Sequence, residues 1–184
     1  MNITGGEGGI SENGGGSGSL GSGIYLQSSH NNNIMVNNAI AIKGGNGGID
    51  GGFGGNGGTG AGSYIKDSAN NVISSSSFFN VSGGLGVDGG YNGTGYGIYL
   101  ENAPSNLIYH NNLINNELNA YDADSNLWYN TTLQEGNYWS DYTGSDNNGD
   151  GIGDTPYNIS GGNNQDVYPF MQPNGCGWHR QIPQ

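Results

Sequence analysis

The sequence predicts an all-β protein, a parallel β-helix (solenoid) in which about four short coils stack along one axis. Three observations indicate this fold. A short phrase around a tyrosine recurs four times, glycine-rich stretches separate the first repeats, and aromatic and acidic residues follow the last one. We expect coils in residues 1–135, a C-terminal aromatic and acidic cap in residues 136–171, and an extended tail in residues 172–184.

The tyrosines set the register of the repeats. They are Tyr25, Tyr64, Tyr99 and Tyr121, at spacings of 39, 35 and 22 residues. Each repeat carries apolar runs too short to form a sheet along the chain, so we expect each coil to stack on the previous one, with like residues roughly 4.8 Å apart. The expected apolar columns are Ile24, Ser63, Ile98 and Ala120; Leu26, Ile65 and Leu100; Ile34, Ile73, Ile108 and Trp128; and Ile40, Phe79 and Ile114.

An asparagine column precedes the third apolar column. Its members are Asn32, Asn71, Asn106 and Asn126. Stacked asparagine side chains pass amide hydrogen bonds from one layer to the next, as in other stacked-strand assemblies. The column therefore favours coils that stack in register.

The coil phrases resemble the right-handed parallel β-helix repeats of the NosD-type family, a carbohydrate-binding and sugar-hydrolase repeat class. The closing stretch, GNYWSDYTGSDNNGDGIGDTPYNISGGNNQDVYPF (residues 136–170), resembles that family more closely. The resemblance covers about residues 20–42, 62–82 and 95–171, and the glycine-rich material between coils departs from the family. It implies a right-handed solenoid and raises copper as a cofactor, for which Met171, Cys176 and His179 are loosely spaced soft ligands.

Three glycine-rich segments interrupt the coils, at residues 5–23, 44–62 and 83–97. Each leaves the coil after an equivalent residue, namely Ile3, Ile42 or Val81. Glycine-rich composition is typical of flexible insertions, which is one interpretation. The other is that the segments form extended left-handed helices with three residues per turn, which pack beside one another. None of the five prolines lies in these segments, which argues against collagen.

Composition limits the partners. The formal net charge is −12 with only three basic residues, so nothing would neutralise nucleic-acid phosphates or an anionic membrane. No apolar stretch approaches 18 residues, so no membrane span is expected. The apolar content of 32% suits the narrow interior of a solenoid better than a broad globular core. We expect one domain with an extracellular or cell-surface location.

The cap contains a calcium-type loop. Its expected ligands are Asp146, Asn148, Asp150, the carbonyl of Ile152 and Asp154, at the alternating spacing that calcium loops use. The usual glutamate at the twelfth position is replaced by a tyrosine, and two other cap aspartates, at positions 141 and 166, are candidates for the missing oxygens. The alternative is a turn rich in Asp and Asn that holds no metal. If calcium binds, we expect a structural role.

Enzymatic activity is not expected. Asp122 and Asp124 are the one close carboxylate pair in the coils, and a solvated turn explains them more simply than catalysis. Lys43 and Lys66 are the strong bases of the coils, and the two coil histidines lie in different columns. We see no serine nucleophile motif.

Two kinds of modification site are present as motifs. The chain has glycosylation motifs at Asn2, Asn80, Asn92, Asn130 and Asn158. Roughly four such motifs would arise from this composition alone, so their number is no evidence of use. Cys176 is the single cysteine and is a candidate for a cross-link between subunits.

Two classes of function follow. The first is a non-enzymatic extracellular structural subunit that stacks head to tail into a filament or fibre, with itself as partner. The second is a carbohydrate-binding or adhesin module that contacts polysaccharide through aromatic residues. A NosD-like periplasmic copper-associated protein is a further alternative, and a fragment of a longer chain is also open. An exposed platform of coplanar aromatic rings would favour binding, and aromatic rings buried against the last coil would favour structure.

Overall fold

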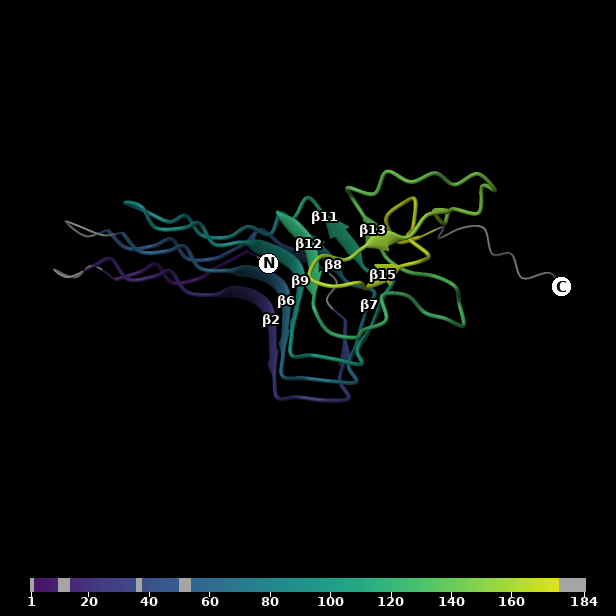
Figure 1. Ribbon diagram of the computed structural model, residues 1–184, viewed down its shortest axis with the longest axis horizontal. Coiled ribbons are helices and arrows are strands. Elements are labelled where there is room, and N and C mark those ends of the chain that lie inside the picture. Colours follow the sequence, from purple (N-terminus) through teal and green to yellow (C-terminus); the bar gives the residue numbers. More distant parts are fainter. Residues whose placement is uncertain (1, 10–13, 36–37, 50–53, 176–184) are drawn as a thin grey trace.

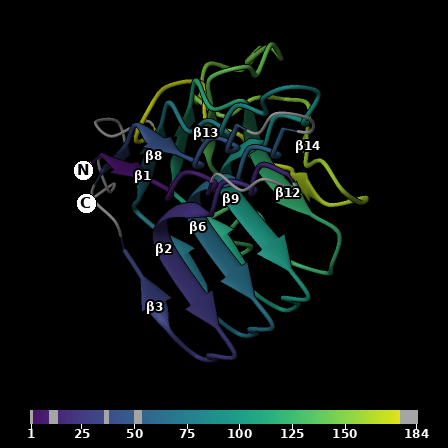
Figure 2. The same ribbon diagram turned by 90° about the vertical axis from the view of Figure 1, so that its left-hand side faces the viewer.

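The structure is a computed structural model that describes residues 2–9, 14–35, 38–49 and 54–175. The described part has strands and no helix, and three stacked parallel sheets run along one axis (Figures 1 and 2). The first sheet contains β2 (Gly21–Gln27), β6 (Gly60–Lys66), β9 (Gly95–Glu101) and β12 (Leu118–Asp122). The second contains β3 (Asn33–Ile34), β7 (Val72–Ser74) and β10 (Leu107–Tyr109). The third contains β4 (Ala39–Ile40), β8 (Ser77–Phe79), β11 (Asn112–Ile114) and β13 (Tyr138–Trp139).

Two small sheets complete the described strands. The pair β1 (Ile3–Thr4) and β5 (Ile42–Lys43) is parallel, and it lies where the chain leaves each coil. The pair β14 (Tyr157–Asn158) and β15 (Gln165–Asp166) is antiparallel and belongs to the C-terminal end. Parallel pairing between repeats confirms the predicted β-helix arrangement of the coils.

The pairing register also agrees with the sequence. Tyr25 pairs with Tyr64, Tyr64 with Tyr99, and Tyr99 with Tyr121. The other predicted columns pair in the same way, for example Ile34 with Ile73. Since successive side chains of a strand point to opposite faces, this register determines which residues meet in the interior.

One predicted apolar column lies on the wrong face. Ile40 pairs with Phe79 as expected, but Ile40 is 39% exposed, whereas the preceding Ala39 is fully buried. The interior column is therefore Ala39, Phe78, Leu113 and Trp139. Both faces of these short strands carry apolar residues, so alternation alone did not identify the inward one.

Ser63 is an exception in the interior. It occupies the column of Ile24 and Ile98, its side chain is fully buried, and its hydroxyl has no hydrogen-bond partner in the described part of the chain. A buried hydroxyl without a partner carries a desolvation cost that nothing offsets.

We therefore expect Ser63→Ala to raise the free energy of unfolding by about 1 kcal/mol, because alanine removes that cost with little change of volume. Urea unfolding measures this change. Ser76→Ala is the matched control, since Ser76 is equally buried but its hydroxyl donates to Ser74 O at 2.9 Å. The control should lose stability, and a loss in Ser63→Ala as well would contradict the expectation.

The glycine-rich segments form one layered projection, which we call the glycine flange (residues 5–9, 14–20, 44–49, 54–59 and 83–94 of the described chain). In Figure 1 it appears as three pairs of extended traces that project side by side from the coils. The strands of the first sheet begin at Gly21, Gly60 and Gly95, so the flange ends a few residues earlier than the sequence suggested.

Backbone hydrogen bonds join all six arms of the flange. One continuous series runs Gly93 N to Gly84 O, Gly84 N to Gly58 O, Gly58 N to Gly45 O, Gly45 N to Ser19 O and Ser19 N to Gly6 O, each at 2.7–2.9 Å. Donors recur every third residue, as at Gly84, Val87, Gly90 and Gly93. This period is the one expected for extended glycine helices with three residues per turn.

Glycine is required at most of these contacts. A Cβ atom built on Gly45 would lie 1.9 Å from Gly6 O, and one built on Gly58 would lie 2.1 Å from Ser19 O. Backbone oxygens cannot move away without separating the arms, so any side chain there would disrupt the packing. Gly9 differs, because a Cβ there would meet no atom of the described residues within 4 Å.

The last coil is covered by aromatic residues. Trp128, Trp139 and Phe170 are buried, and the two indole rings lie 5.7 Å apart. Strand β13 continues the third sheet through its pairing with β11, so residues 138–139 still belong to the stack rather than to a separate cap. In the part of the chain that the structure describes, no helix is long and apolar enough to cross a membrane.

Candidate functional site

The predicted asparagine column forms a hydrogen-bonded ladder. Asn32 donates to Asn71 Oδ1 through both its backbone and side-chain nitrogens at 2.9 Å, and Asn71 donates to Asn106 Oδ1 at 2.8 and 3.0 Å. Asn106 N then donates to Asn126 Oδ1 at 2.7 Å. The ladder ends where Asn126 Nδ2 donates to Asp122 Oδ1 at 2.8 Å. A carboxylate accepts hydrogen bonds only, so it closes a chain of donors.

Asp122 is a structural carboxylate. It is fully buried and also accepts hydrogen bonds from Trp128 Nε1 and Asn164 Nδ2, both at 2.8 Å. Burial raises the pKa of Asp122 above its ordinary value, although the hydrogen bonds favour the charged form. The expectation that Asp122 lies on a solvated turn is therefore wrong, because Trp128 and Asn164 enclose its side chain. Asp124 lies nearby and accepts from Ala103 N at 2.7 Å.

A second ladder, which the sequence analysis missed, runs along the next corner. Asn111 donates to Asn137 Oδ1 from its backbone at 3.1 Å and from its side chain at 2.9 Å. Asn137 N donates to Asp166 Oδ2 at 2.6 Å, and Trp139 Nε1 donates to the same oxygen at 2.9 Å. Each ladder thus ends on a buried aspartate that also binds an indole N–H. The sequence feature that could have revealed this ladder is an asparagine two residues before each of the core residues Leu113 and Trp139.

A third chain of polar side chains links the last coil to the cap. Asn116 Nδ2 donates to Asn119 Oδ1 at 3.0 Å, and Asn119 Nδ2 donates to Asp141 Oδ1 at 2.7 Å. Tyr157 Oη donates to the other Asp141 oxygen at 3.1 Å, and its ring stacks on Trp139 at 4.1 Å. Burial raises the pKa of Tyr157. Asp141 is therefore a third carboxylate that accepts the last hydrogen bond of a chain of polar side chains.

The predicted metal loop, residues 146–154, is held by its own hydrogen bonds. Asp146 accepts from Gly149 N at 2.7 Å and from Gly151 N at 2.8 Å. Asp150 Oδ1 accepts from Ile152 N at 2.9 Å. Gly149 and Gly151 have φ values of 74° and 84°, which glycine adopts without strain and which a sharp turn needs.

The donor atoms suit a hard cation. All five expected ligands, Asp146, Asn148, Asp150, Ile152 and Asp154, supply oxygen, which is the atom calcium prefers. In the described residues, however, no three His, Cys, Asp or Glu side chains gather closely enough to hold a metal. Asp154 Oδ2 instead accepts from Asn147 N at 2.7 Å. These are hydrogen bonds of the kind that turns rich in Asp and Asn make.

The further ligands suggested for this loop have other partners. Asp166 is fully buried and accepts four N–H hydrogen bonds, so its oxygens already have partners within the cap. Asp141 binds Asn119 and Tyr157. Tyr157, at the twelfth loop position, belongs to the packing of the cap.

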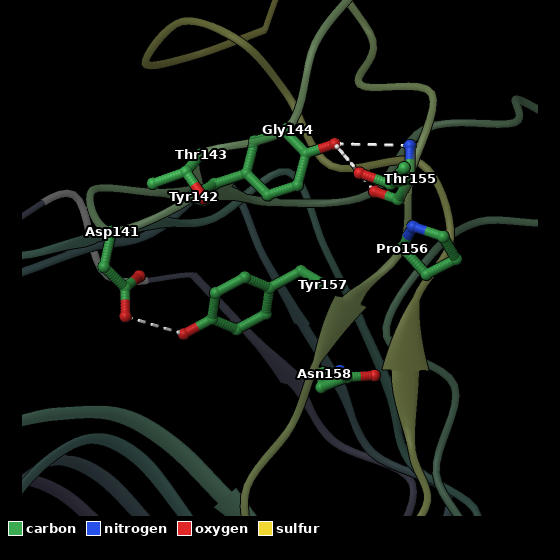
Figure 3. A pocket seen from close by; sticks show the side chains of 8 residues that line it. All are labelled: Asp141, Tyr142, Thr143, Gly144, Thr155, Pro156, Tyr157 and Asn158. Atoms are coloured by element: carbon green, nitrogen blue, oxygen red, sulfur yellow. Dashed lines mark hydrogen bonds between the residues drawn. The ribbon is translucent and has the colours of Figure 1, made fainter.

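A shallow depression lies at the base of the loop (Figure 3). It is lined by residues 141–144 and 155–158, on both sides of the metal loop. Tyr142 Oη lies 2.7 Å from Thr155 O, its acceptor, and joins the two sides. Figure 3 shows the rings of Tyr142 and Tyr157 in the depression, with the Tyr157 hydroxyl directed at Asp141. Its lining offers hydroxyl, carboxylate and amide groups but no cationic side chain.

Asp166 gives the cap a pH dependence. Burial raises the pKa of Asp166 to about 6 from 3.8, although hydrogen bonds from Trp139 and Asn137 oppose the shift. The folded protein then holds this proton more tightly than the unfolded chain, so the stabilisation is present below about pH 4 and is lost as the pH rises through about 6.

We expect this group to lower the free energy of unfolding by about 3 kcal/mol between about pH 4 and about pH 7. The measurement is unfolding free energy against pH, for the protein and for Asp166→Asn, which does not titrate. The difference between the two profiles should fall over that interval. A difference that is constant with pH would contradict the shift.

The remaining predicted sites are spread along the chain, and one of them, Asn158, also lines the depression. The glycosylation motifs at Asn2, Asn80, Asn92 and Asn158 have exposed asparagines, whereas Asn130 is half-buried and accepts from Thr132 N and Leu133 N at 3.0 Å. Cys176 and His179 lie outside the described residues, as does most of the predicted tail. The two coil histidines have different hydrogen-bond partners. His30 Nδ1 accepts from Ala69 N at 2.9 Å, and His110 Nε2 lies 2.7 Å from Glu135 Oε2.

Comparison with known proteins gave one match. A family model described as "Periplasmic copper-binding protein (NosD)" matches residues 8–144. No curated protein and no solved structure matched the chain.

Proposed function

Since the chain belongs to the NosD family of parallel β-helix proteins, we propose that it is a non-enzymatic structural protein that acts outside the cytoplasm. The family's description as periplasmic supports a location in the cell envelope or beyond it. The observation that carries the structural role is the way the solenoid is closed. Three polar chains end on Asp122, Asp166 and Asp141, and the first two carboxylates are fully buried.

The close carboxylate pair of the coils supports a structural role. Asp122, the buried member of the close carboxylate pair, has no exposed surface and accepts three side-chain hydrogen bonds. Retaining and inverting glycosidases need two carboxyl groups that face a substrate groove. A role in stability explains the burial of Asp122 and catalysis does not.

The aromatic residues support the same choice. Trp128, Trp139 and Phe170 are buried against the last coil, so they offer no exposed platform for a sugar ring. In the first sheet Tyr64 and Tyr96 stack on Tyr99, at 4.8 and 4.6 Å, and so cover part of its ring surface. A sugar needs an exposed ring face for stacking, so these contacts favour structure over carbohydrate binding.

Calcium is proposed as a structural cofactor of the cap loop. Asp146, Asn148, Asp150, the Ile152 carbonyl and Asp154 would hold the ion, which would supply positive charge to three carboxylates within nine residues. The present hydrogen bonds keep the loop near the required turn but do not bring the three carboxylates together. Binding would therefore reorient Asp154 away from Asn147.

We expect calcium to raise the melting temperature by about 5–10 °C at a concentration about 100 times its dissociation constant, which corresponds to about 2.7 kcal/mol. Differential scanning calorimetry with calcium and with a chelator measures this shift. The double variant Asp150→Asn/Asp154→Asn should lose it. Asp88→Asn, which removes a charge in the flange, should keep it. An equal melting temperature with calcium and with chelator would contradict the proposal.

Copper is not part of this proposal. Copper sites use imidazole, thiolate or thioether ligands, and in the described residues no His or Cys side chains gather with carboxylates into a group of three. Met171 is within the described residues, but the cysteine and histidine that the sequence placed near it are not.

The partner that we propose is another copy of the same chain. In the described part of the chain, the outer edges of β2, β3 and β4 have no paired strand, and unpaired parallel edges favour the addition of another strand. The opposite end is covered by cap residues such as Phe170, so a head-to-tail filament would join these edges to the cap.

Negative-stain electron microscopy, with and without chelator, tests assembly. Regular filaments support it, and their loss on chelation ties assembly to the cap loop. Dispersed particles in both conditions would reject the filament and leave polysaccharide binding, through the depression beside Tyr142, as the alternative to test.

A further inference from the structure

A row of tyrosines covers the outer face of the first sheet. It consists of Tyr25, Tyr64, Tyr96, Tyr99 and Tyr121, and we call it the tyrosine row. The strands that carry it lie side by side in Figure 2. Neighbouring rings in the row have centroids 4.6–6.0 Å apart, and Tyr64 and Tyr99 are stacked at 4.8 Å with 27° between their planes.

Within the tyrosine row, Tyr64 has a carboxylate base in place. Its hydroxyl donates a hydrogen bond to Glu101, whose other oxygen lies 2.5 Å from Lys66 Nζ. Lys66 fixes the carboxylate against the phenol and, together with Tyr64, holds the pKa of Glu101 below its usual value. Burial raises the pKa of Tyr64 and of Tyr99, so both are neutral phenols near neutral pH.

A neutral phenol that loses an electron becomes a strong acid and must release its proton. A carboxylate already bound to the hydroxyl accepts that proton without rearrangement. Glu101 is such an acceptor for Tyr64, and water is available to Tyr99, which is partly exposed. The stacked pair therefore combines two requirements of phenol coupling, namely ring proximity and a route for the proton.

We propose that Tyr64 and Tyr99 are an oxidative modification site, at which a peroxide-driven one-electron oxidant couples them into dityrosine. Each phenol gives one electron to the oxidant; the Tyr64 proton goes to Glu101 and the Tyr99 proton to water. The two phenoxyl radicals form one bond between ring carbons next to the hydroxyls, and the hydrogens on those carbons return to the oxygens. The oxidant reduces one hydrogen peroxide to two water molecules, so the protein loses two hydrogen atoms.

The bond would join consecutive coils covalently. Tyr64 lies in β6 and Tyr99 in β9, and the third part of the glycine flange lies between them in the chain. A cross-link that closes such a loop restricts the unfolded chain, as a disulfide does. The described strands would thereby gain a covalent cross-link that needs no cysteine. This site is independent of the calcium loop and of assembly.

The test is treatment of dilute protein with a haem peroxidase and hydrogen peroxide, followed by dityrosine fluorescence and mass mapping of the linked peptides. We expect an intramolecular product, two hydrogens lighter, that joins Tyr64 to Tyr99. Tyr64→Phe and Tyr99→Phe keep the rings and should lose this product. Tyr91→Phe is the control, because Tyr91 is 82% exposed and lies in the flange, and it should leave the yield unchanged.

Glu101→Gln tests the proton acceptor and should slow coupling by roughly tenfold or more. Two results would overturn the proposal. One is that dityrosine forms at Tyr91 or between molecules, which would mean that exposure alone selects the site. The other is that the yield is unchanged in Tyr64→Phe and Tyr99→Phe.

Discussion

Asp166→Ala is expected to lower the free energy of unfolding by about 3–5 kcal/mol. The substitution leaves four buried donors without an acceptor, on Asn137 N, Asn137 Nδ2, Trp139 Nε1 and Tyr168 N. Each unsatisfied buried donor costs about 1–3 kcal/mol, and relaxation of the cap reduces the sum. Chemical denaturation in calcium-free buffer measures the change.

Asp166→Asn separates the loss of acceptors from the loss of the side chain. Its carbonyl oxygen can keep the three bonds now made by Oδ2, but its amide group then faces Tyr168 N–H, which is also a donor. We expect about 1–3 kcal/mol of destabilisation for this variant. Asp154→Ala is the control, because Asp154 is exposed and its loss should cost little without calcium. Equal stabilities of Asp166→Ala and Asp154→Ala would contradict the capping role.

Gly45→Ala is expected to destabilise the glycine flange. Its Cβ would lie 1.9 Å from Gly6 O and 2.8 Å from Gly5 O, and the substituted residue lies in the middle arm that joins two layers. Overpacking of this kind costs about 1–3 kcal/mol, and the shift of the arm also weakens the Gly58 N to Gly45 O bond of 2.7 Å. Thermal unfolding and amide exchange of the flange measure these two effects.

Gly9→Ala is the matched control for this prediction. Gly9 belongs to the same flange, but its added Cβ would lie more than 4 Å from every atom in the part of the chain that the structure describes. We expect a stability within about 0.5 kcal/mol of the unsubstituted protein. If both alanine variants were equally stable, the arms would not be packed as the structure places them.

The sequence predicted the coil register because the tyrosine phrases repeat with their neighbours in constant order. Stacking then requires Tyr25, Tyr64 and Tyr99 to pair, which they do. The inward face of the third sheet was less certain from pattern alone. The outward Ile40 and Phe79 are larger than the inward Ala39 and at least as apolar. The apolar pattern therefore did not distinguish the two faces of the strands.

The closing carboxylates could not be predicted from local patterns. Asp122 accepts a hydrogen bond from Asn164, which lies 42 positions later in the sequence. Asp166 accepts one from Asn137, which lies 29 positions earlier. These partners meet only because residues 157–166 fold back over the last coil. The spacing of Asp146, Asp150 and Asp154 predicted an oxygen-rich loop, but the ion that would gather these carboxylates is not specified by the spacing alone.

Amide hydrogen exchange, with calcium and with chelator, is the most direct test of an ordered solenoid with a calcium-stabilised cap. We predict that Gly45, Gly58 and Gly84 exchange as slowly as the strands in both conditions, since each donates a backbone bond of 2.7–2.9 Å. Residues 146–154 should be protected more strongly with calcium. Exchange of the flange glycines at the rate of an unstructured chain would contradict the packed flange. Identical protection of the loop in both conditions would contradict the calcium site.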